Sequence, residues 1–262
     1  MMKKFILFAL LVLPLTFASC GGDDDEPSYP DKTLVAGDVY SIPNGTTGWT
    51  SDNELIASIS PDGVKAEHVG ETYIRNGSQS FKVTVTGKYN IYQEPYMNFG
   101  ASMSTVKSFM SNYTLKEETD KALLYNGVFP VDYHLFSFKD GGLYLSCVII
   151  KATSVSTDVL TAFMQERYIY VTVNKEKYYF GFISPDGQRL IVLQLNTLDS
   201  QVVYEIIYAQ NTATGSAPAQ ITRMMEQKNS ATATAVNDNI KAEYTRLSSV
   251  LPAANGGQQA SK

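Results

Sequence analysis

The stretch YHLFSFKDGGLYLSCVII, residues 133–150, consists of two apolar, aromatic-rich runs separated by Asp140-Gly141-Gly142. An Asp-Gly pair between two such runs is a signal of an antiparallel β-hairpin. The stretch YYFGFISPDGQRLIVLQL, residues 178–195, follows the same plan, with Pro185-Asp186-Gly187 at its turn. The chain is therefore expected to contain two similar hairpins.

A segment with the apolar spacing of a helix precedes each hairpin. These segments are residues 104–111 and 156–166, and the serine that begins each is a candidate N-cap. The apolar residues that share one side of the predicted helix are Val106, Phe109 and Met110 in the first segment and Leu160, Phe163 and Met164 in the second. One helix-plus-antiparallel-sheet unit is thus predicted twice within residues 89–210, giving an α+β domain. Two such units side by side would form one longer sheet with both helices on one face.

This tandem pattern resembles that of β-lactamase-inhibitor-like proteins. Strict alternation along residues 168–173 would turn Ile169, Val171 and Val173 toward the helices, and Tyr168, Tyr170 and Thr172 outward. Tyr144 would face outward in the first unit, opposite Leu143, Leu145, Cys147 and Ile149. Because tyrosine offers a large contact area and a hydroxyl, Tyr144, Tyr168 and Tyr170 are the candidate ligand contacts. The alternative is that these tyrosines lie on the sheet surface, as tyrosines commonly do, without forming a binding face.

Residues 33–87 contain short alternating runs separated by turn residues, which predicts a small β-sandwich. The blocks at residues 49–53, 56–60, 61–64, 70–74 and 81–85 resemble a bacterial Ig-like group 2 domain. The resemblance implies that Trp49 lies in the core and that Gly63 and Gly70 lie in turns. It also implies the role of a stalk or, less often, of an adhesive surface. The whole chain is therefore expected to be mainly β.

The N-terminus has the features of a signal peptide, with Lys3 and Lys4 before the apolar run of residues 5–17. Ala18-Ser19-Cys20 then resembles a bacterial lipobox, which implies cleavage after residue 19 and a lipid on Cys20. The acidic residues that follow resemble the export signal of surface lipoproteins of the Bacteroidetes type. Residues 20–32 would then form a tether, and the expected location is the cell envelope, on the outer membrane and exposed at the surface.

The charge and the cysteines restrict the partners. Formal net charge is −5, and removal of residues 1–19 would make it −7. An acidic chain without a basic cluster is not expected to bind nucleic acid. The chain has two cysteines, so a lipid on Cys20 would leave Cys147 without a disulfide partner, as a buried thiol.

No signature of catalysis, of a metal site or of a cofactor is present in the sequence. The two histidines, His68 and His134, fall in different predicted domains, and His134 is expected to be a satisfied core or edge residue. The acids Glu117, Glu118, Asp120 and Asp132 are adequately explained as a solvated loop. Three hypotheses remain: a non-enzymatic module that binds a glycan or a protein, an inhibitor or scaffold of another enzyme, and a hydrolase with scattered carboxylates.

Residues 211–262 form a polar tail that is expected either to be partly helical or to be an interaction tail without structure, with residues 253–262 disordered in both cases. Its single predicted helix has apolar residues at helical spacing, namely Ile240, Tyr244, Leu247 and Leu251.

Replacement of Cys20 by serine removes the thiol to which a lipid would be attached. We expect Cys20→Ser to abolish acylation and to release the protein from the membrane fraction. Metabolic labelling with a fatty acid, followed by cell fractionation, measures both effects. Retention of the variant in membranes, together with an unlabelled wild-type chain, would contradict the anchor.

Overall fold

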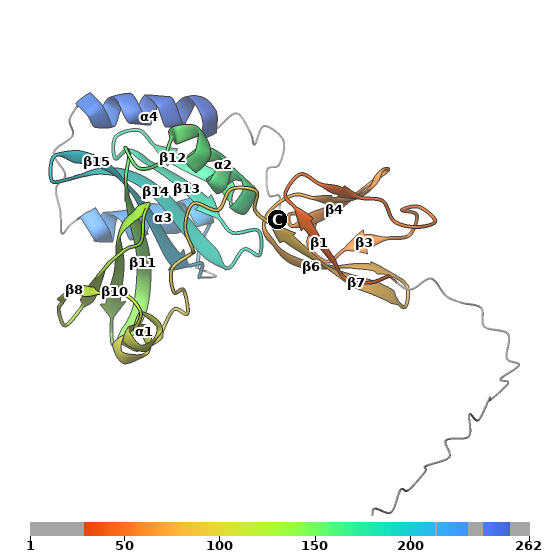
Figure 1. The fold of residues 1–262 in the computed structure, drawn as a ribbon, viewed down its shortest axis with the longest axis horizontal. Helices are drawn as coiled ribbons and strands as arrows, with labels where there is room; N and C mark the ends of the chain where they lie inside the picture. The colour runs from red at the N-terminus through yellow and green to blue at the C-terminus, as the bar shows by residue number, and fades with distance from the viewer. Residues whose placement is uncertain (1–28, 213, 230–237, 252–262) are drawn as a thin grey trace, which may run out of the picture.

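The computed structural model describes residues 29–212, 214–229 and 238–251. The predicted signal peptide, Cys20 and most of the acidic tether lie outside these residues, as does the expected disorder of residues 253–262. The described chain is mainly β, as the hairpin signals predicted, and contains four helices. Figure 1 shows a small β-sandwich beside a larger part that contains all four of these helices.

The small part consists of two sheets. One has the strand order β1-β7-β6-β3 and the other β2-β5-β4. The strands are β1 (Lys32–Val35), β2 (Val39–Tyr40), β3 (Thr50–Ser51), β4 (Ala57–Ser60), β5 (Gly63–Ala66), β6 (Gly70–Asn76) and β7 (Gln79–Thr86).

The core of the sandwich is built around Trp49, which is buried against Phe81 with ring centroids 5.4 Å apart. Alternation along β7 supplies Phe81, Val83 and Val85 to this core. The β4–β5 turn requires a glycine, because Gly63 has φ +140° and a Cβ there would lie 2.1 Å from the Tyr40 carbonyl oxygen. These residues have their own core, which is separate from the clusters of the larger part.

The larger part contains one helix followed by four strands, twice. The first unit is α1 (Met103–Phe109), β8 (Leu115–Glu118), β9 (Ala122–Asn126), β10 (Val131–Lys139) and β11 (Gly142–Lys151). The second is α2 (Thr157–Arg167), β12 (Ile169–Asn174), β13 (Tyr179–Ile183), β14 (Arg189–Leu198) and β15 (Gln201–Gln210). Antiparallel pairing of β11 with β15 joins them into one sheet of order β12-β13-β14-β15-β11-β10-β9-β8.

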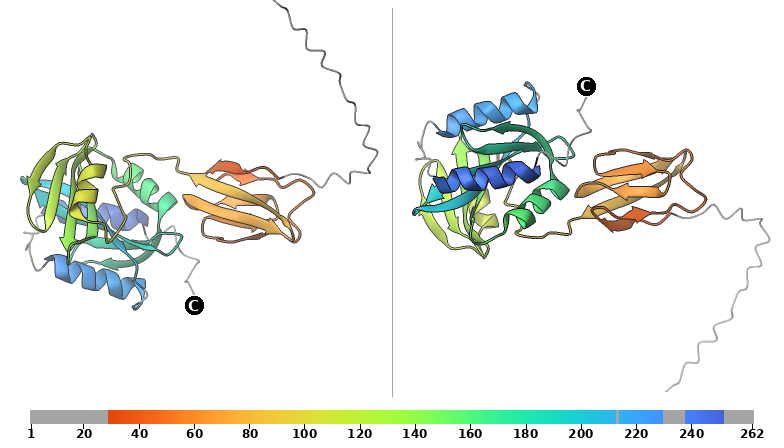
Figure 2. Two further views of the ribbon diagram at one scale, coloured as in Figure 1. Left: turned by 90° about the horizontal axis from the view of Figure 1, so that it is seen from below. Right: turned by 90° about the horizontal axis from the view of Figure 1, so that it is seen from above.

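Helices cover both faces of this sheet, which corrects the prediction of an open aromatic face. On one face lie α1, α2 and α4 (Asp238–Val250), with α2 and α4 side by side (Figure 1). On the other face lies α3 (Ala217–Asn229; Figure 2). There Ile221 and Met225 pack on Val192 and Ile207. The central strands are therefore apolar on both faces.

A register irregularity between β10 and β11 changes which side chains of β11 share a face. β11 has one more residue than β10 at Tyr144, since Leu145 pairs with Ser137 and Leu143 with Phe138. Leu143 consequently packs under α1, whereas Leu145, Cys147 and Ile149 pack on the face of α3. The prediction that all four share one face was wrong for Leu143.

The helix starts were predicted to within two residues. Ser156 is the N-cap of α2, as expected, and its hydroxyl accepts from the Val159 amide. The cap of α1 is Ser102 rather than Ser104. Phe109, which was expected to face the core with Val106 and Met110, is instead exposed.

The chain beyond residue 210 contains two described helices where one was predicted. The expected helix is α4, whose Ile240, Tyr244, Leu247 and the following Leu251 are buried. The helix α3 was not predicted from the sequence. Its buried side, around Ile221, contains few apolar residues, and the surrounding sequence is strongly polar.

The sandwich is held against the end of α2. The Glu166 carboxylate accepts from the backbone amides of Lys88 and Tyr89, both at 2.9 Å, and its carbonyl accepts from the Val69 amide at 2.8 Å. Arg167 pairs with Glu166 and donates to Asn90 Oδ1 at 2.9 Å. The segment between the two parts is therefore fixed by hydrogen bonds.

Replacement of Trp49 by alanine leaves a large void in the sandwich core. We expect Trp49→Ala to lower the free energy of unfolding by about 3–5 kcal/mol. Urea unfolding of the purified chain measures the loss. The control is Val39→Ala, at an exposed position of the same sandwich, which should leave stability almost unchanged. Equal losses for both variants would contradict the assignment of Trp49 to the core.

Candidate functional site

Two of the three tyrosines proposed as ligand contacts do not lie on an open surface. Tyr168 is only 3% exposed and belongs to the main core cluster. Tyr170 is half-buried and packs edge-to-face on Phe182, on the side of α2 and α4. A register shift between Tyr170 and Thr172 breaks the alternation on which the outward assignment rested. The prediction was therefore wrong for Tyr168, and Tyr170 shares its face with the helices.

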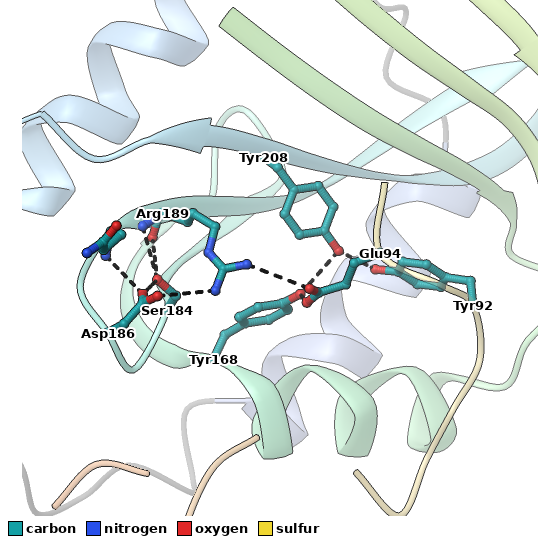
Figure 3. Close-up of polar contacts among 8 residues, drawn as sticks. Tyr92, Glu94, Tyr168, Ser184, Asp186, Arg189 and Tyr208 are labelled. Atoms are coloured by element: carbon teal, nitrogen blue, oxygen red, sulfur yellow. Dashed lines mark hydrogen bonds and ion pairs between the residues drawn. The ribbon is translucent and has the colours of Figure 1, made fainter. Parts of the chain in front are cut away.

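The hydroxyl of Tyr168 belongs to a buried polar network. It donates to the carboxylate of Glu94 and lies 3.3 Å from the Tyr208 hydroxyl, which is 2.7 Å from the Tyr92 hydroxyl (Figure 3). Burial, followed by the nearby Glu94 charge, raises the pKa of Tyr168 well above its ordinary value. These tyrosines stay neutral, and they fix residues 92–94 on the core instead of offering a recognition surface.

Glu94 connects this network to the β13–β14 turn. Its Oε2 lies 3.7 Å from Arg189 Nη1, and Arg189 Nη2 lies 3.3 Å from Asp186 Oδ2 (Figure 3). The Asp186 carboxylate also accepts hydrogen bonds from the Ser184 hydroxyl and, at 3.0 Å, from the backbone amide of Gln188. Burial raises the pKa of Asp186, but these hydrogen bonds and the Arg189 charge outweigh it and hold that pKa below its ordinary value.

Tyr144, the third proposed contact, is 39% exposed and lines a hollow. The hollow, of about 520 Å³, lies between α3 and the ends of β10, β11, β14 and β15. A second hollow, of about 590 Å³, is lined by residues 97–99, by the turn residues Asp186–Arg189 and by Gln210 and Asn211. Both are lined by Phe99 and Gln210, so we treat them as one site, the polar hollow.

The lining of the polar hollow is rich in hydrogen-bonding groups of several kinds. Carboxylates come from Asp140 and Asp186, and cations from Lys139, Arg189 and Arg223. The amide side chains are Asn98, Gln188, Gln210, Asn211, Gln220 and Gln227. Gln220 is buried, and its amide connects Asn211 to Thr212 and Gly215. The wall is thus held in place by its own hydrogen bonds, with donors and acceptors side by side.

The other described cysteine, acidic and histidine side chains considered in the sequence analysis do not line the polar hollow. Cys147 is a buried free thiol whose pKa is raised by burial. Glu117 and Glu118 lie on the exposed strand β8 rather than in a loop. Within the described residues, no group of three or more His, Cys, Asp and Glu side chains is arranged to hold a metal ion. His134 is buried as expected but not satisfied, since its Nδ1 has no partner among the described residues.

Comparisons with known proteins give no relative from which a role could be transferred. No protein-family model, no curated protein and no solved structure matches the chain. Among the described residues, no helix has the length and apolar character needed to cross a membrane.

The pKa of Asp186 predicts a pH-dependent contribution to stability. Its folded-state pKa lies below the value of about 3.9 for an unfolded aspartate, so the stabilisation is complete above that pH and disappears as pH falls through the folded-state pKa. We expect Asp186→Asn to be less stable than wild type at pH 7, by a difference that becomes smaller as pH falls below about 3.9. Urea unfolding at several pH values measures this difference.

A second Pro-Asp-Gly turn in the chain supplies the control. Asp62 occupies the corresponding position in the sandwich. There its backbone carbonyl accepts a hydrogen bond from the Ser41 hydroxyl. Asp62→Asn should show little effect at any pH. A loss in Asp186→Asn that is the same at pH 3 and pH 7 would contradict the role of the ionised carboxylate.

Proposed function

We propose that this chain is a non-enzymatic binding module of the cell envelope that binds a glycan in the polar hollow. In this proposal a lipid on Cys20 holds the chain at the outer membrane, and the sandwich of residues 32–86 is the spacer. The tether restricts diffusion, which suits capture at a surface.

The observation that carries the proposal is the composition of the polar hollow. A sugar presents many hydroxyls, each both donor and acceptor, and amide side chains match them because they offer both functions in one plane. An exposed aromatic residue can stack on the apolar face of a sugar ring, and Tyr144 is in position to do so. Each of the two parts of the hollow has the size of an ordinary small-ligand site.

Binding without turnover is favoured by the state of Asp186 at the hollow. A general acid needs a raised pKa, whereas the pKa of Asp186 is lowered and its carboxylate is occupied by Ser184, Gln188 and Arg189. Glu94, the other carboxylate on Arg189, is engaged by Tyr168 and lines a different cavity.

The test uses residues 20–262 on a glycan array, followed by titration of the best ligand. We expect Tyr144→Ala to weaken binding at least 30-fold, equivalent to about 2 kcal/mol for a central aromatic contact. Gln210→Ala, between the two parts of the hollow, should weaken it as well. The matched control is Tyr73→Ala on the sandwich, since Tyr73 is 45% exposed and Tyr144 39%.

Three outcomes are informative. Loss of binding in both hollow variants but not in Tyr73→Ala supports the site. Unchanged binding by a folded Tyr144→Ala, Gln210→Ala double variant would rule out the polar hollow. Turnover of a glycan by the purified chain would contradict the non-enzymatic role.

A further inference from the structure

A second concave site lies near the start of β10, away from the β10–β11 turn that lines the polar hollow. Two cavities of about 250 and 430 Å³ are both lined by Gln93, Tyr113, Val128 and His134. The larger reaches Phe109 at the end of α1, and the smaller reaches Phe129 in the β9–β10 connection. We call this site the His134 groove.

The rim of the His134 groove carries the most exposed large apolar side chains of the described chain. Phe129 is 81% exposed, and Val128 and Phe109 follow it in exposure. Single exposed apolar residues are ordinary, but three along one groove form a patch of the kind that marks a binding site. A ligand in the groove would remove apolar surface of all three from water.

The floor of the groove contains a polar group with an unmet hydrogen bond. His134 is 6% exposed, lines both cavities and packs edge-to-face on Tyr113 with ring centroids 5.3 Å apart. Its Nδ1 has no hydrogen-bond partner among the described residues. Burial lowers the pKa of His134 to about 4, so the ring is neutral at physiological pH and offers one donor and one acceptor. A buried polar atom without a partner is costly, and a bound polar group near the ring would reduce that cost.

The charge of the lining selects among ligands. Glu94 is the charged side chain that lines the groove, and it is shared with Tyr168 and Arg189. An anion would meet this carboxylate without a cation in the lining to compensate it. The polar hollow, in contrast, has three cations in its lining.

The geometry points to a second ligand site in the His134 groove, for an uncharged aromatic molecule that carries one hydroxyl. In this site the aromatic ring of the ligand lies between Tyr113 and the rim formed by Val128 and Phe129. The hydroxyl of the ligand forms a hydrogen bond with the imidazole of His134. This site differs in chemistry and position from the polar hollow, so it does not depend on the glycan proposal.

Three probes with one ring system test the proposal on residues 20–262: 1-naphthol, naphthalene and naphthalene-1-sulfonate. Equilibrium dialysis measures their affinities. We expect 1-naphthol to bind most tightly, naphthalene several-fold more weakly, and the sulfonate at least tenfold more weakly than 1-naphthol. In His134→Leu the advantage of 1-naphthol over naphthalene should disappear, because the hydroxyl loses its partner.

Variants at exposed positions keep the test valid if His134→Leu fails to fold. Val128→Ser, Phe129→Ser should weaken 1-naphthol binding at least tenfold. Its matched control, Val39→Ser, Tyr73→Ser, removes two exposed apolar side chains from the sandwich and should bind as wild type does. Equal loss in both double variants, binding of the sulfonate as tight as that of 1-naphthol, or no binding of 1-naphthol would each overturn the proposal.

Discussion

The antiparallel pairing of β11 with β15 is the interaction on which the larger part of the molecule depends. Seven residue pairs, from Leu145–Ala209 to Lys151–Val203, join two four-stranded units that would each end in an open edge. Unpaired edges expose backbone donors and acceptors, and a four-stranded sheet with one helix leaves apolar surface uncovered. Joining the units places the most apolar strands, β11, β14 and β15, at the centre of the sheet.

That central position explains why helices are needed on both faces. Val148 and Ile206 point toward α2 and α4, whereas Cys147 and Ile207 point toward α3. The segment after β15 therefore completes the core, although its composition is that of a polar tail. The polar hollow depends on the same arrangement, because it is lined by α3 together with the ends of β11, β14 and β15.

The local parts of this fold were predictable and the long-range parts were not. Asp-Gly turns, the Ser156 cap and the apolar spacing of α4 depend on neighbouring residues, so the sequence displays them directly. The orientations of Leu143 and Tyr168 depend on register shifts at Tyr144 and after Tyr170, which no local pattern reveals. Exposure of Tyr144 was predicted correctly, but the amides around it come from separate segments and have no common spacing. His134 was predicted to be satisfied because burial usually implies a partner.

The contacts between the sandwich and the larger part connect the proposed spacer to both candidate sites. Asn53 donates to the Pro185 carbonyl at 3.0 Å, and the residues after Pro185 form a wall of the polar hollow. Glu166 and Arg167 hold residues 88–90, the start of the segment that runs through Tyr92 and Glu94 to Phe99. Residues 91–95 of that segment line the His134 groove, and residues 97–99 line the polar hollow. The contacts at the junction of the two parts therefore involve the same backbone segments that line the two proposed sites.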